Sequence, residues 1–181
     1  MYLHQHKIIH RDLKPANVMF KDSDGSYDLA IIDFGLATEE SRYASLFKSC
    51  GTKGYMAPEI LNTQPHTVKS DLFAVGVIFY MMLTGVPPFS KNGEDPIEIE
   101  KKNKEASPCY DWVSFGMTFE QNEQVLVESF LRKLITKRPE DRMSAKEALE
   151  HGIFQLQKLQ HSTVEQPTTV FGNNDVVSFL K

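Results

Sequence analysis

Residues 10–17 read HRDLKPAN, and this stretch says more about the fold than any other part of the chain. It brings an acid, a base and an amide, Asp12, Lys14 and Asn17, into one short segment. A carboxylate beside a hydroxyl group can orient that group and accept its proton. An ammonium group can meet a phosphate as a point charge, and an amide oxygen is a hard ligand that suits Mg²⁺. The three side chains together therefore point to a reactive site.

Two further motifs follow in chain order, DFG at residues 33–35 and APE at residues 57–59. A lone Asp in a loop is usually a turn former or a helix cap, and DFG by itself is a weak signal. The longer stretch is far more specific, and the three motifs in this order are more specific still. Together they resemble the catalytic loop, the metal-binding loop and the end of the activation segment of a eukaryotic protein kinase.

The resemblance covers roughly residues 1–155 and implies a mainly α fold with a short β-hairpin, the C-terminal (large) lobe of a protein kinase (α+β). Residues 156–181, where the apolar pattern weakens, are expected to form a C-terminal tail outside this partial kinase domain. The hairpin is predicted by the short apolar runs at 18–20 and 29–32, which flank the turn signal Asp24-Gly25. Residues 36–56 show little periodicity and are expected to form a long loop.

The longest apolar run, residues 72–83, is apolar on every face, which predicts a helix buried in the middle of the domain. Ser70 is expected to cap this helix, and Gly85 with the prolines after it is expected to end it. Ser144 and Glu147 form a capping-box pattern at the start of a short last helix. That last helix is expected at residues 143–149. The other segments with helical composition are residues 1–6, 94–106 and 119–136.

The resemblance assigns chemical roles to five residues. It implies that Asp12 orients the acceptor hydroxyl and takes its proton, while Lys14 neutralises charge on the ATP phosphate being transferred. It implies that Asn17 and Asp33 hold Mg²⁺ beside the nucleotide, so that ATP and Mg²⁺ are the expected cofactors. Lys14, together with Thr52, which matches the family threonine that bonds the catalytic Asp and Lys, favours Ser/Thr over Tyr as the acceptor.

A second set of residues is expected to be structural, again by resemblance: His10, Phe34, Gly35, Glu59, Asp71 and Arg142. His10 and Phe34 resemble core residues that pack behind the site. Glu59 and Arg142 resemble a buried ion pair that anchors the activation segment, although two unrelated surface charges would fit as well. Asp71 resembles an acid that binds the catalytic-loop backbone; it can equally be a charge favoured by the dipole at a helix N-terminus.

Regulation by phosphorylation is a further expectation. Arg11 directly precedes Asp12, and in the family this Arg often receives a phosphate placed on the activation segment by an upstream kinase. Ser45 and Ser49 are better placed as acceptors than Thr52, whose hydroxyl is already committed. The full set of candidate acceptors is Ser41, Tyr43, Ser45, Ser49 and Thr52.

Composition and motif content bear on four questions: nucleic-acid binding, membrane spanning, calcium binding and the redox state of the compartment. The net charge of −4 gives no reason to propose a nucleic-acid partner, and residues 72–83 are too short to span a membrane. No Asp-x-Asp-x-Asp-Gly loop with a downstream Glu occurs, so calcium binding is not supported. The cysteines, Cys50 and Cys109, lack CxxC spacing, which favours a reducing, intracellular compartment such as the cytoplasm. Cys50 can be a redox-sensitive thiol or an inert one.

The sequence also departs from the family pattern. No G-x-G-x-x-G motif occurs among the ten glycines, so the N-terminal lobe that positions ATP is expected to be absent and this chain alone is expected to have little or no activity. Two function classes follow: a protein Ser/Thr kinase represented by its catalytic lobe, or a non-catalytic binding or scaffold protein. The long connection from Asn17 to Asp33 resembles the calcium/calmodulin-dependent group of kinases. The implied partner is a protein substrate.

Overall fold

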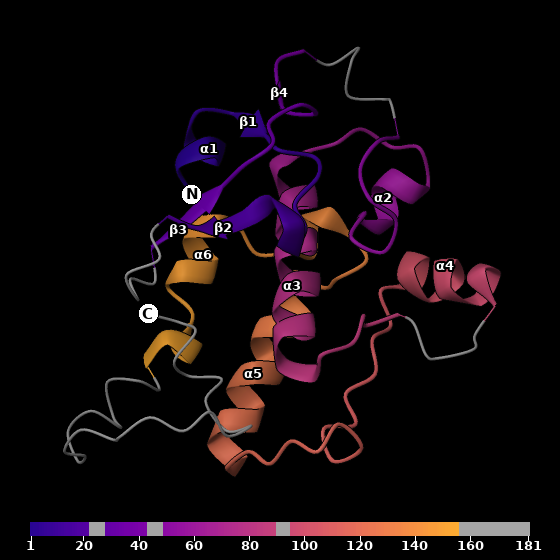
Figure 1. The fold of residues 1–181 in the computed structure, drawn as a ribbon, viewed down its shortest axis with the longest axis vertical. Helices are drawn as coiled ribbons and strands as arrows, with labels where there is room; N and C mark the ends of the chain where they lie inside the picture. Colours follow the sequence, from indigo (N-terminus) through magenta and orange to yellow (C-terminus); the bar gives the residue numbers. More distant parts are fainter. Residues whose placement is uncertain (22–27, 43–48, 90–94, 156–181) are drawn as a thin grey trace.

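The computed structural model describes residues 1–21, 28–42, 49–89 and 95–155, and Figure 1 shows their arrangement. The α-helices are α1 (Tyr2–Gln5), α2 (Pro58–Leu61), α3 (Val68–Thr84), α4 (Pro96–Glu105), α5 (Gln121–Leu134) and α6 (Ala145–Leu149). The strands are β1 (Ile8–Ile9), β2 (Val18–Phe20), β3 (Leu29–Ile31) and β4 (Thr38–Glu39). Short 3₁₀-helices are η1 (Pro15–Asn17), η3 (Pro139–Asp141) and η4 (Gly152–Gln155). The described part is mostly helical with a few short strands, as expected.

Helix α3 runs through the centre of the molecule and contains the predicted buried helix (Figure 1). The prediction that Ser70 caps it was wrong. Thr67 is the N-cap, and its side chain accepts a hydrogen bond from the backbone N–H of Lys69 at 3.2 Å. Ser70 occupies the third helical position, and its hydroxyl accepts a hydrogen bond from the Thr67 backbone N–H at 3.1 Å. The helix begins before the apolar run because this reciprocal capping box satisfies its first free N–H groups.

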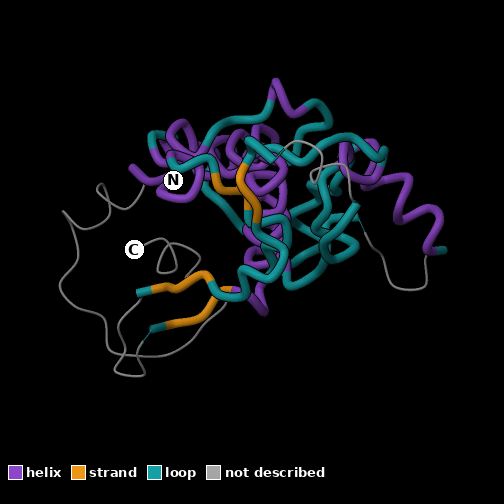
Figure 2. The backbone as a smooth tube through the Cα atoms, turned by 90° about the horizontal axis from the view of Figure 1, so that it is seen from above, coloured by secondary structure: helices purple, strands orange, loops and turns teal. Residues whose placement is uncertain are grey.

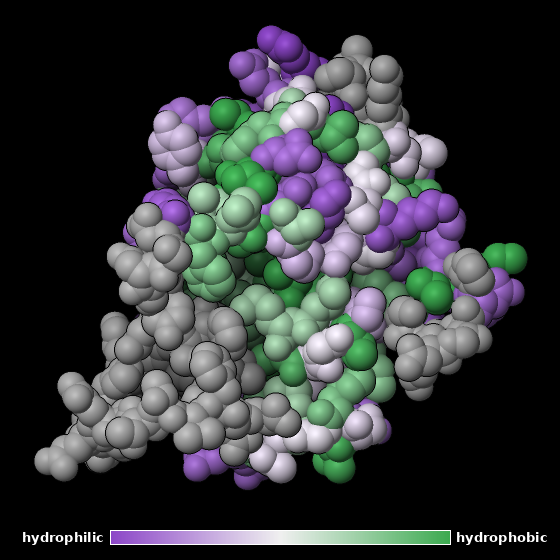
Figure 3. Space-filling view, viewed as in Figure 1, coloured by the Kyte–Doolittle hydropathy of each residue, from purple (hydrophilic) through white to green (hydrophobic). Residues whose placement is uncertain are grey.

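The predicted hairpin is present as β2 paired antiparallel with β3, with Met19 opposite Ala30 and Phe20 opposite Leu29. Its Asp24-Gly25 turn lies outside the described residues. Figure 2 shows the two strands projecting from the helical part of the molecule. The exposed fractions of Met19, Phe20, Leu29 and Ile31 are 53%, 54%, 52% and 43%. Figure 3 shows hydrophobic surface where the hairpin lies on this face. The strands therefore pair with each other but leave large apolar side chains uncovered.

The segment expected to be a long loop, residues 36–56, is not wholly irregular. Its residues Thr38 and Glu39 form β4, which pairs antiparallel with β1 so that Ile9 lies opposite Thr38 and Ile8 opposite Glu39. This pairing joins residues about thirty positions apart, so no local pattern announces it. Residues 43–48 of the segment lie outside the described part. After the segment, Pro58 starts helix α2, with proline in the first turn, where its missing N–H costs nothing.

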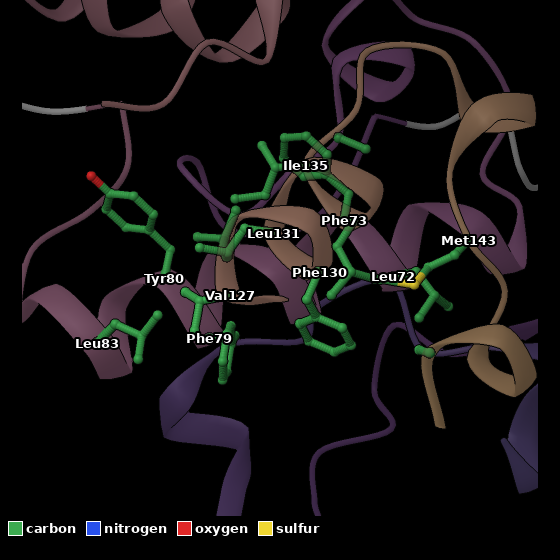
Figure 4. Packing of buried hydrophobic residues seen from close by; sticks show 14 of the residues in the cluster. Leu72, Phe73, Phe79, Tyr80, Leu83, Val127, Phe130, Leu131, Ile135 and Met143 are labelled. Atoms are coloured by element: carbon green, nitrogen blue, oxygen red, sulfur yellow. The ribbon is translucent and has the colours of Figure 1, made fainter. Parts of the chain in front are cut away.

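The hydrophobic core lies mainly between α3 and α5 (Figure 4). Phe79 of α3 meets Phe130 of α5 edge to face, with ring centroids 5.2 Å apart. The two helices approach closely at Gly76, where an added Cβ would lie 2.8 Å from the Cβ of Leu134. Burying a large apolar side chain contributes about 1.5–3 kcal/mol. The aromatic and aliphatic residues of these helices therefore fix the platform on which the loops rest.

The remaining predicted helices are present with shifted ends. Helices α4 and α5 lie within the predicted ranges 94–106 and 119–136, and α6 starts at Ala145 rather than Met143. Ser144 and Glu147 form the predicted capping box of α6. No helix in the described ranges is both long enough and apolar enough to cross a membrane. The predicted tail, residues 156–181, lies outside the described residues.

Candidate active site

The backbone of the HRDLKPAN stretch is held by a carboxylate on α3. Asp71, which is 3% exposed, accepts hydrogen bonds from the backbone N–H groups of His10 at 2.9 Å and Arg11 at 3.0 Å. Arg11 has a φ of 67°, and a left-handed conformation costs a non-glycine residue about 1–3 kcal/mol. Hydrogen bonds to a charged group contribute about 1.5–3 kcal/mol each, enough to offset this strain. Asp71 thereby holds the turn that presents Asp12.

The side chain of His10 is fully buried behind that turn. Its Nε2 lies 3.1 Å from the carbonyl oxygen of Ile32, and its Nδ1 lies 3.4 Å from the backbone N–H of Asp12. One tautomer satisfies both contacts, because Nε2–H can donate to the carbonyl while Nδ1 accepts from the N–H. His10 therefore ties Asp12 to the residue that precedes Asp33.

Asp12, Lys14 and Thr52 form a closed set of polar contacts. The ammonium of Lys14 donates to Oδ2 of Asp12 at 2.8 Å and to Oγ1 of Thr52 at 2.9 Å. The hydroxyl of Thr52 in turn donates to Oδ1 of Asp12 at 2.7 Å. The Asp12 side chain is 10% exposed and the Lys14 side chain 26% exposed, so solvent screens these contacts only in part. The cluster joins the HRDLKPAN stretch to the segment that carries Thr52.

These contacts also set the ionisation of Asp12. Burial by itself would raise the pKa of the carboxyl, because it disfavours the charged form. Hydrogen bonds from Lys14 and Thr52 and the positive charge of Lys14 outweigh burial, so the pKa of Asp12 lies below its ordinary value. Asp12 is therefore ionised at neutral pH. A carboxylate with a lowered pKa is a weak base, so its chemistry suits orientation of a hydroxyl better than removal of its proton.

Asn17 and Asp33 flank the base of the hairpin. The Asn17 side chain is buried, and its Nδ2 donates to the carbonyl oxygen of Asp12 at 2.8 Å. The backbone N–H of Ile32 donates to the carbonyl oxygen of Asn17 at 3.0 Å, which places Asp33 directly after that contact. Asp33 has a φ of 60° and is exposed, and its Oδ1 accepts a hydrogen bond from the N–H of Gly35 at 3.2 Å.

The donor set at the hairpin base fits a magnesium ion. The amide nitrogen of Asn17 is occupied by Asp12, which leaves its amide oxygen as the group that can bind a cation. Asp33 adds an exposed carboxylate, and Mg²⁺ prefers such hard oxygen ligands while keeping several waters and substrate phosphates. Among the described residues, no group of three or more His, Cys, Asp or Glu side chains could hold a metal by itself. Asn17 and Asp33 therefore suit a metal ion whose remaining ligands are phosphate oxygens and water.

A buried ion pair fixes the segment after Thr52 to the helical core. Arg142 donates to the two carboxylate oxygens of Glu59 at 2.8 and 3.0 Å, and the two residues are 1% and 4% exposed. Arg142 also donates to the carbonyl oxygen of Thr136 at 2.9 Å, and Ser70 donates to Glu59 at 3.2 Å. The paired, planar geometry offsets the large cost of burying both charges. The expected pair is therefore present, and the alternative of two surface charges is excluded.

The segment also touches the HRDLKPAN stretch directly. A Cβ added to Gly51 would lie 2.7 Å from the carbonyl oxygen of Arg11, closer than side chains tolerate. Gly51 has a φ of 115°, which also favours glycine. Thr52 reaches Asp12 because the backbone can pass this close to Arg11.

Other residues singled out from the sequence lie in less expected places. Phe34 is 47% exposed and not a core residue, although its ring contacts the edge of His10 with centroids 5.0 Å apart. It directly follows Asp33, whose left-handed backbone no sequence pattern indicated. The Arg11 side chain donates from Nε to the carbonyl oxygen of Leu36 at 2.6 Å. Ser49 is exposed, and Ser45 lies outside the described residues.

Two contacts near the site were missed by the sequence analysis. His4 Nε2 lies 3.0 Å from Oδ2 of Asp71, and Cys50 Sγ lies 3.7 Å from Nε2 of His66. The partners are 67 and 16 positions apart and belong to no shared motif, so the sequence held no signal for them.

Comparison with known proteins places the chain in a family. A family model described as the protein kinase domain matches residues 1–154. The calcium/calmodulin-dependent protein kinase cmkB of Emericella nidulans is 39% identical over 154 residues, 83% of this chain and 36% of that protein. The calcium/calmodulin-dependent protein kinase type I of Schizosaccharomyces pombe is 36% identical over 155 residues, 83% of this chain and 43% of that protein.

A third relative belongs to another named group. The serine/threonine-protein kinase 17A of Oryctolagus cuniculus is 35% identical over 150 residues, 83% of this chain and 36% of that protein. The chain thus spans less than half of the length of these relatives.

Proposed function

The chain belongs to the protein kinase domain family, and we propose that its site transfers the γ-phosphoryl group of ATP to Ser or Thr hydroxyls of proteins. One observation carries the proposal: the closed contacts among Asp12, Lys14 and Thr52. To orient a hydroxyl group near a phosphate, a site needs an ionised carboxylate with an ammonium group beside it. A binding or scaffold protein has no need for this arrangement, so it favours the enzyme over that alternative.

On the acceptor side, Asp12 orients the substrate hydroxyl and receives its proton. The hydroxyl oxygen bonds to the γ-phosphorus of ATP as the bond from that phosphorus to the β,γ-bridging oxygen breaks, and ADP leaves. Lys14 lies against Asp12 and Thr52, where its charge can meet the phosphoryl oxygens as negative charge develops. Thr52 holds both partners through one hydroxyl, so the alignment depends on the position of the segment that carries it. The proposed preference for Ser and Thr acceptors rests on Lys14 and Thr52.

On the nucleotide side, we propose that Asn17 and Asp33 hold Mg²⁺ through their side-chain oxygens. ATP with Mg²⁺ supplies the phosphoryl group and neutralises part of its charge when bound. Asn17 also donates to the backbone of Asp12, so one side chain links the metal side to the acceptor side.

Regulation and partners are further parts of the proposal. An upstream kinase that phosphorylates Ser45 or Ser49 would place a dianion on the segment that leads to Thr52, where Arg11 is the candidate receptor. The similarity to two calcium/calmodulin-dependent kinases supports placement in that group. We propose the cytoplasm as the location, from the two cysteines without CxxC spacing.

A chimera tests the chemistry directly. Residues 1–154 replace the matching region of the Schizosaccharomyces pombe kinase, and transfer of phosphate to a basic Ser/Thr peptide is measured with Mg²⁺ and ATP. The chimera should phosphorylate the peptide, and Asp12→Asn should reduce the rate about 10²–10⁴-fold. Asp28→Asn, a change of the same type at an exposed residue, is the control and should leave the rate unchanged. A folded chimera that binds ATP without transferring phosphate would refute the proposal.

The 181-residue chain is assayed beside the chimera. We expect little transfer from it, because none of its ten glycines belongs to a G-x-G-x-x-G motif that could cover the ATP phosphates. Robust transfer by the chain alone, lost with Asp12→Asn, would overturn this expectation while supporting the assignment of Asp12.

A further inference from the structure

A cavity lies where the C-terminal end of α3 meets the connections on either side of α4 (Figure 1). Its volume is about 470 Å³. Sites for small molecules have volumes of roughly 300–1,000 Å³, so the cavity is of the right size for one. Its lining comes from Tyr80 of α3, residues 86–89, Lys102 of α4 and residues between 107 and 115. None of the residues assigned above to phosphoryl transfer is among these lining residues.

The interior of the cavity is largely apolar and aromatic. The Tyr80 hydroxyl donates to the carbonyl oxygen of Cys109 at 2.6 Å, and Figure 4 shows it pointing away from the other labelled core residues. Burial raises the pKa of Tyr80 above its ordinary value, so the hydroxyl keeps its proton and its bond. The ring of Phe115 meets the Tyr80 ring edge to face, with centroids 6.2 Å apart. Pro87 and Pro88 add apolar lining without N–H donors, so the interior suits an aromatic group.

The rim of the cavity carries a carboxylate in a fixed turn. Asp111 is exposed, and its Oδ1 accepts a hydrogen bond from the backbone N–H of Ser114 at 3.3 Å. The Ser114 hydroxyl donates in turn to the carbonyl oxygen of Asp111 at 2.9 Å. Among the described residues, the Asp111 carboxylate forms no ion pair.

The cation that also lines the cavity does not balance this charge. Lys102 already interacts with another group, so its ammonium is not free. The uncompensated charge at the rim is therefore the negative charge of Asp111. A bound molecule complements the cavity when it places a positive charge at Asp111 and an apolar body in the interior, whereas an anion would be repelled.

We propose that this cavity binds small organic cations with an aromatic body, of the arylalkylamine type. The aromatic group lies against Tyr80 and Phe115, and the ammonium group contacts the Asp111 carboxylate. Because Asp111 is exposed, solvent screens the ion pair, and the positive charge should improve binding only about threefold to fivefold over a neutral analogue.

The experiment compares three probes that share one aromatic body: naphthylethylamine, naphthylethanol and naphthylacetate. Each is titrated at neutral pH and low salt into the full 181-residue chain, and two-dimensional NMR gives the dissociation constant. The amine should bind about threefold to fivefold more tightly than the alcohol, and the acetate should bind most weakly. The shifted resonances should lie in residues 86–89 and 107–115. In Asp111→Asn the dissociation constant of the amine should rise to that of the alcohol, while binding of the alcohol stays unchanged.

Asp141→Asn is the matched control, because Asp141 is also exposed but does not line the cavity, and it should keep the preference for the amine. Equal dissociation constants for the three probes in the wild-type chain would overturn the proposal. A preference that persists in Asp111→Asn, or resonance shifts elsewhere in the chain only, would also overturn it. So would a lack of resonance shifts at the solubility limit of the amine. The readout is binding, so a failure here leaves the proposed phosphoryl transfer untouched.

Discussion

The acceptor side and the metal side of the site are built in different ways. The acceptor side, defined here as Asp12, Lys14 and Thr52, rests on buried charges in the helical core. Asp71 holds the turn before Asp12, and the ion pair of Arg142 holds the segment after Thr52. The metal side consists of Asn17 and Asp33 at the base of a two-stranded hairpin. Its strands leave large apolar side chains about half exposed.

The difference shows where the stability of the site comes from. A buried ionic network stays ordered because any break leaves an unpaired charge in a region of low polarity. A two-stranded hairpin is marginal by itself, and its order depends on what packs against it. Several large apolar side chains of β2 and β3 are exposed on the same hairpin, whereas on most protein surfaces such residues are scattered singly. Substitutions among the buried charges that support the acceptor side should therefore cost far more than substitutions on the hairpin.

The largest effect is expected at Arg142. Arg142→Leu leaves the carboxylate of Glu59 buried without its partner, which should cost about 3–5 kcal/mol of unfolding free energy. Urea unfolding followed by circular dichroism measures this loss. Arg138→Leu is the matched control, because Arg138 pairs with Glu140 at the surface and is 67% exposed. It should leave the urea midpoint unchanged. Equal losses in the two variants would remove the basis of the comparison.

A smaller effect is expected at Asp71. Asp71→Asn removes the negative charge that receives the N–H groups of His10 and Arg11, so it should cost about 1.5–3 kcal/mol. The amide protons of His10 and Arg11 should also exchange faster, which hydrogen exchange with mass spectrometry detects. Asp141→Asn, at an exposed position, serves as the control. Unaltered exchange at both amides would show that Asp71 is only a helix-terminal charge.

The pH dependence of stability probes Asp12. Its pKa in the folded chain lies below the ordinary value of 3.8, because hydrogen bonds from Lys14 and Thr52 favour the ionised form. A depressed pKa contributes stability that is fully present above the unfolded value and is lost as pH falls through the folded value. The difference in urea midpoint between wild type and Asp12→Asn should therefore be largest at neutral pH and shrink below pH 4. A constant difference across this range would contradict the ionic contacts at Asp12.

Much of the fold and of the site could be predicted because local chemistry decides it. The apolar run of α3, the Ser144–Glu147 capping box and the hairpin strands each carry a pattern that neighbours in sequence complete. The side chains near Asp12 were indicated by the resemblance of the three motifs to a protein kinase. Thr52 lies 40 positions after Asp12 in the chain, yet the APE motif located the segment that supplies this contact.

Features that depend on tertiary contacts were not predictable. Strand β4 exists only because β1 supplies its partner, and Thr67 replaced Ser70 as the cap because both residues satisfy the same pattern. The exposure of Phe34 and the left-handed backbone of Asp33 beside it were likewise not indicated by the DFG motif. The approach of His66 to Cys50 depends on where α2 and α3 place their connection, which composition does not encode.

The smallest effect is expected on the hairpin. Phe20→Thr replaces a side chain that is 54% exposed with one that keeps a high strand propensity, so the unfolding free energy should change by about 0.5 kcal/mol or less. The same substitution at Phe130, which is 4% exposed, should cost about 3 kcal/mol or more because it leaves a cavity in the core. Urea unfolding of both variants measures the two losses of unfolding free energy, which are then compared. A large loss at Phe20 would mean that the hairpin is as firmly built into the fold as the acceptor side, and the contrast between the two regions would fail.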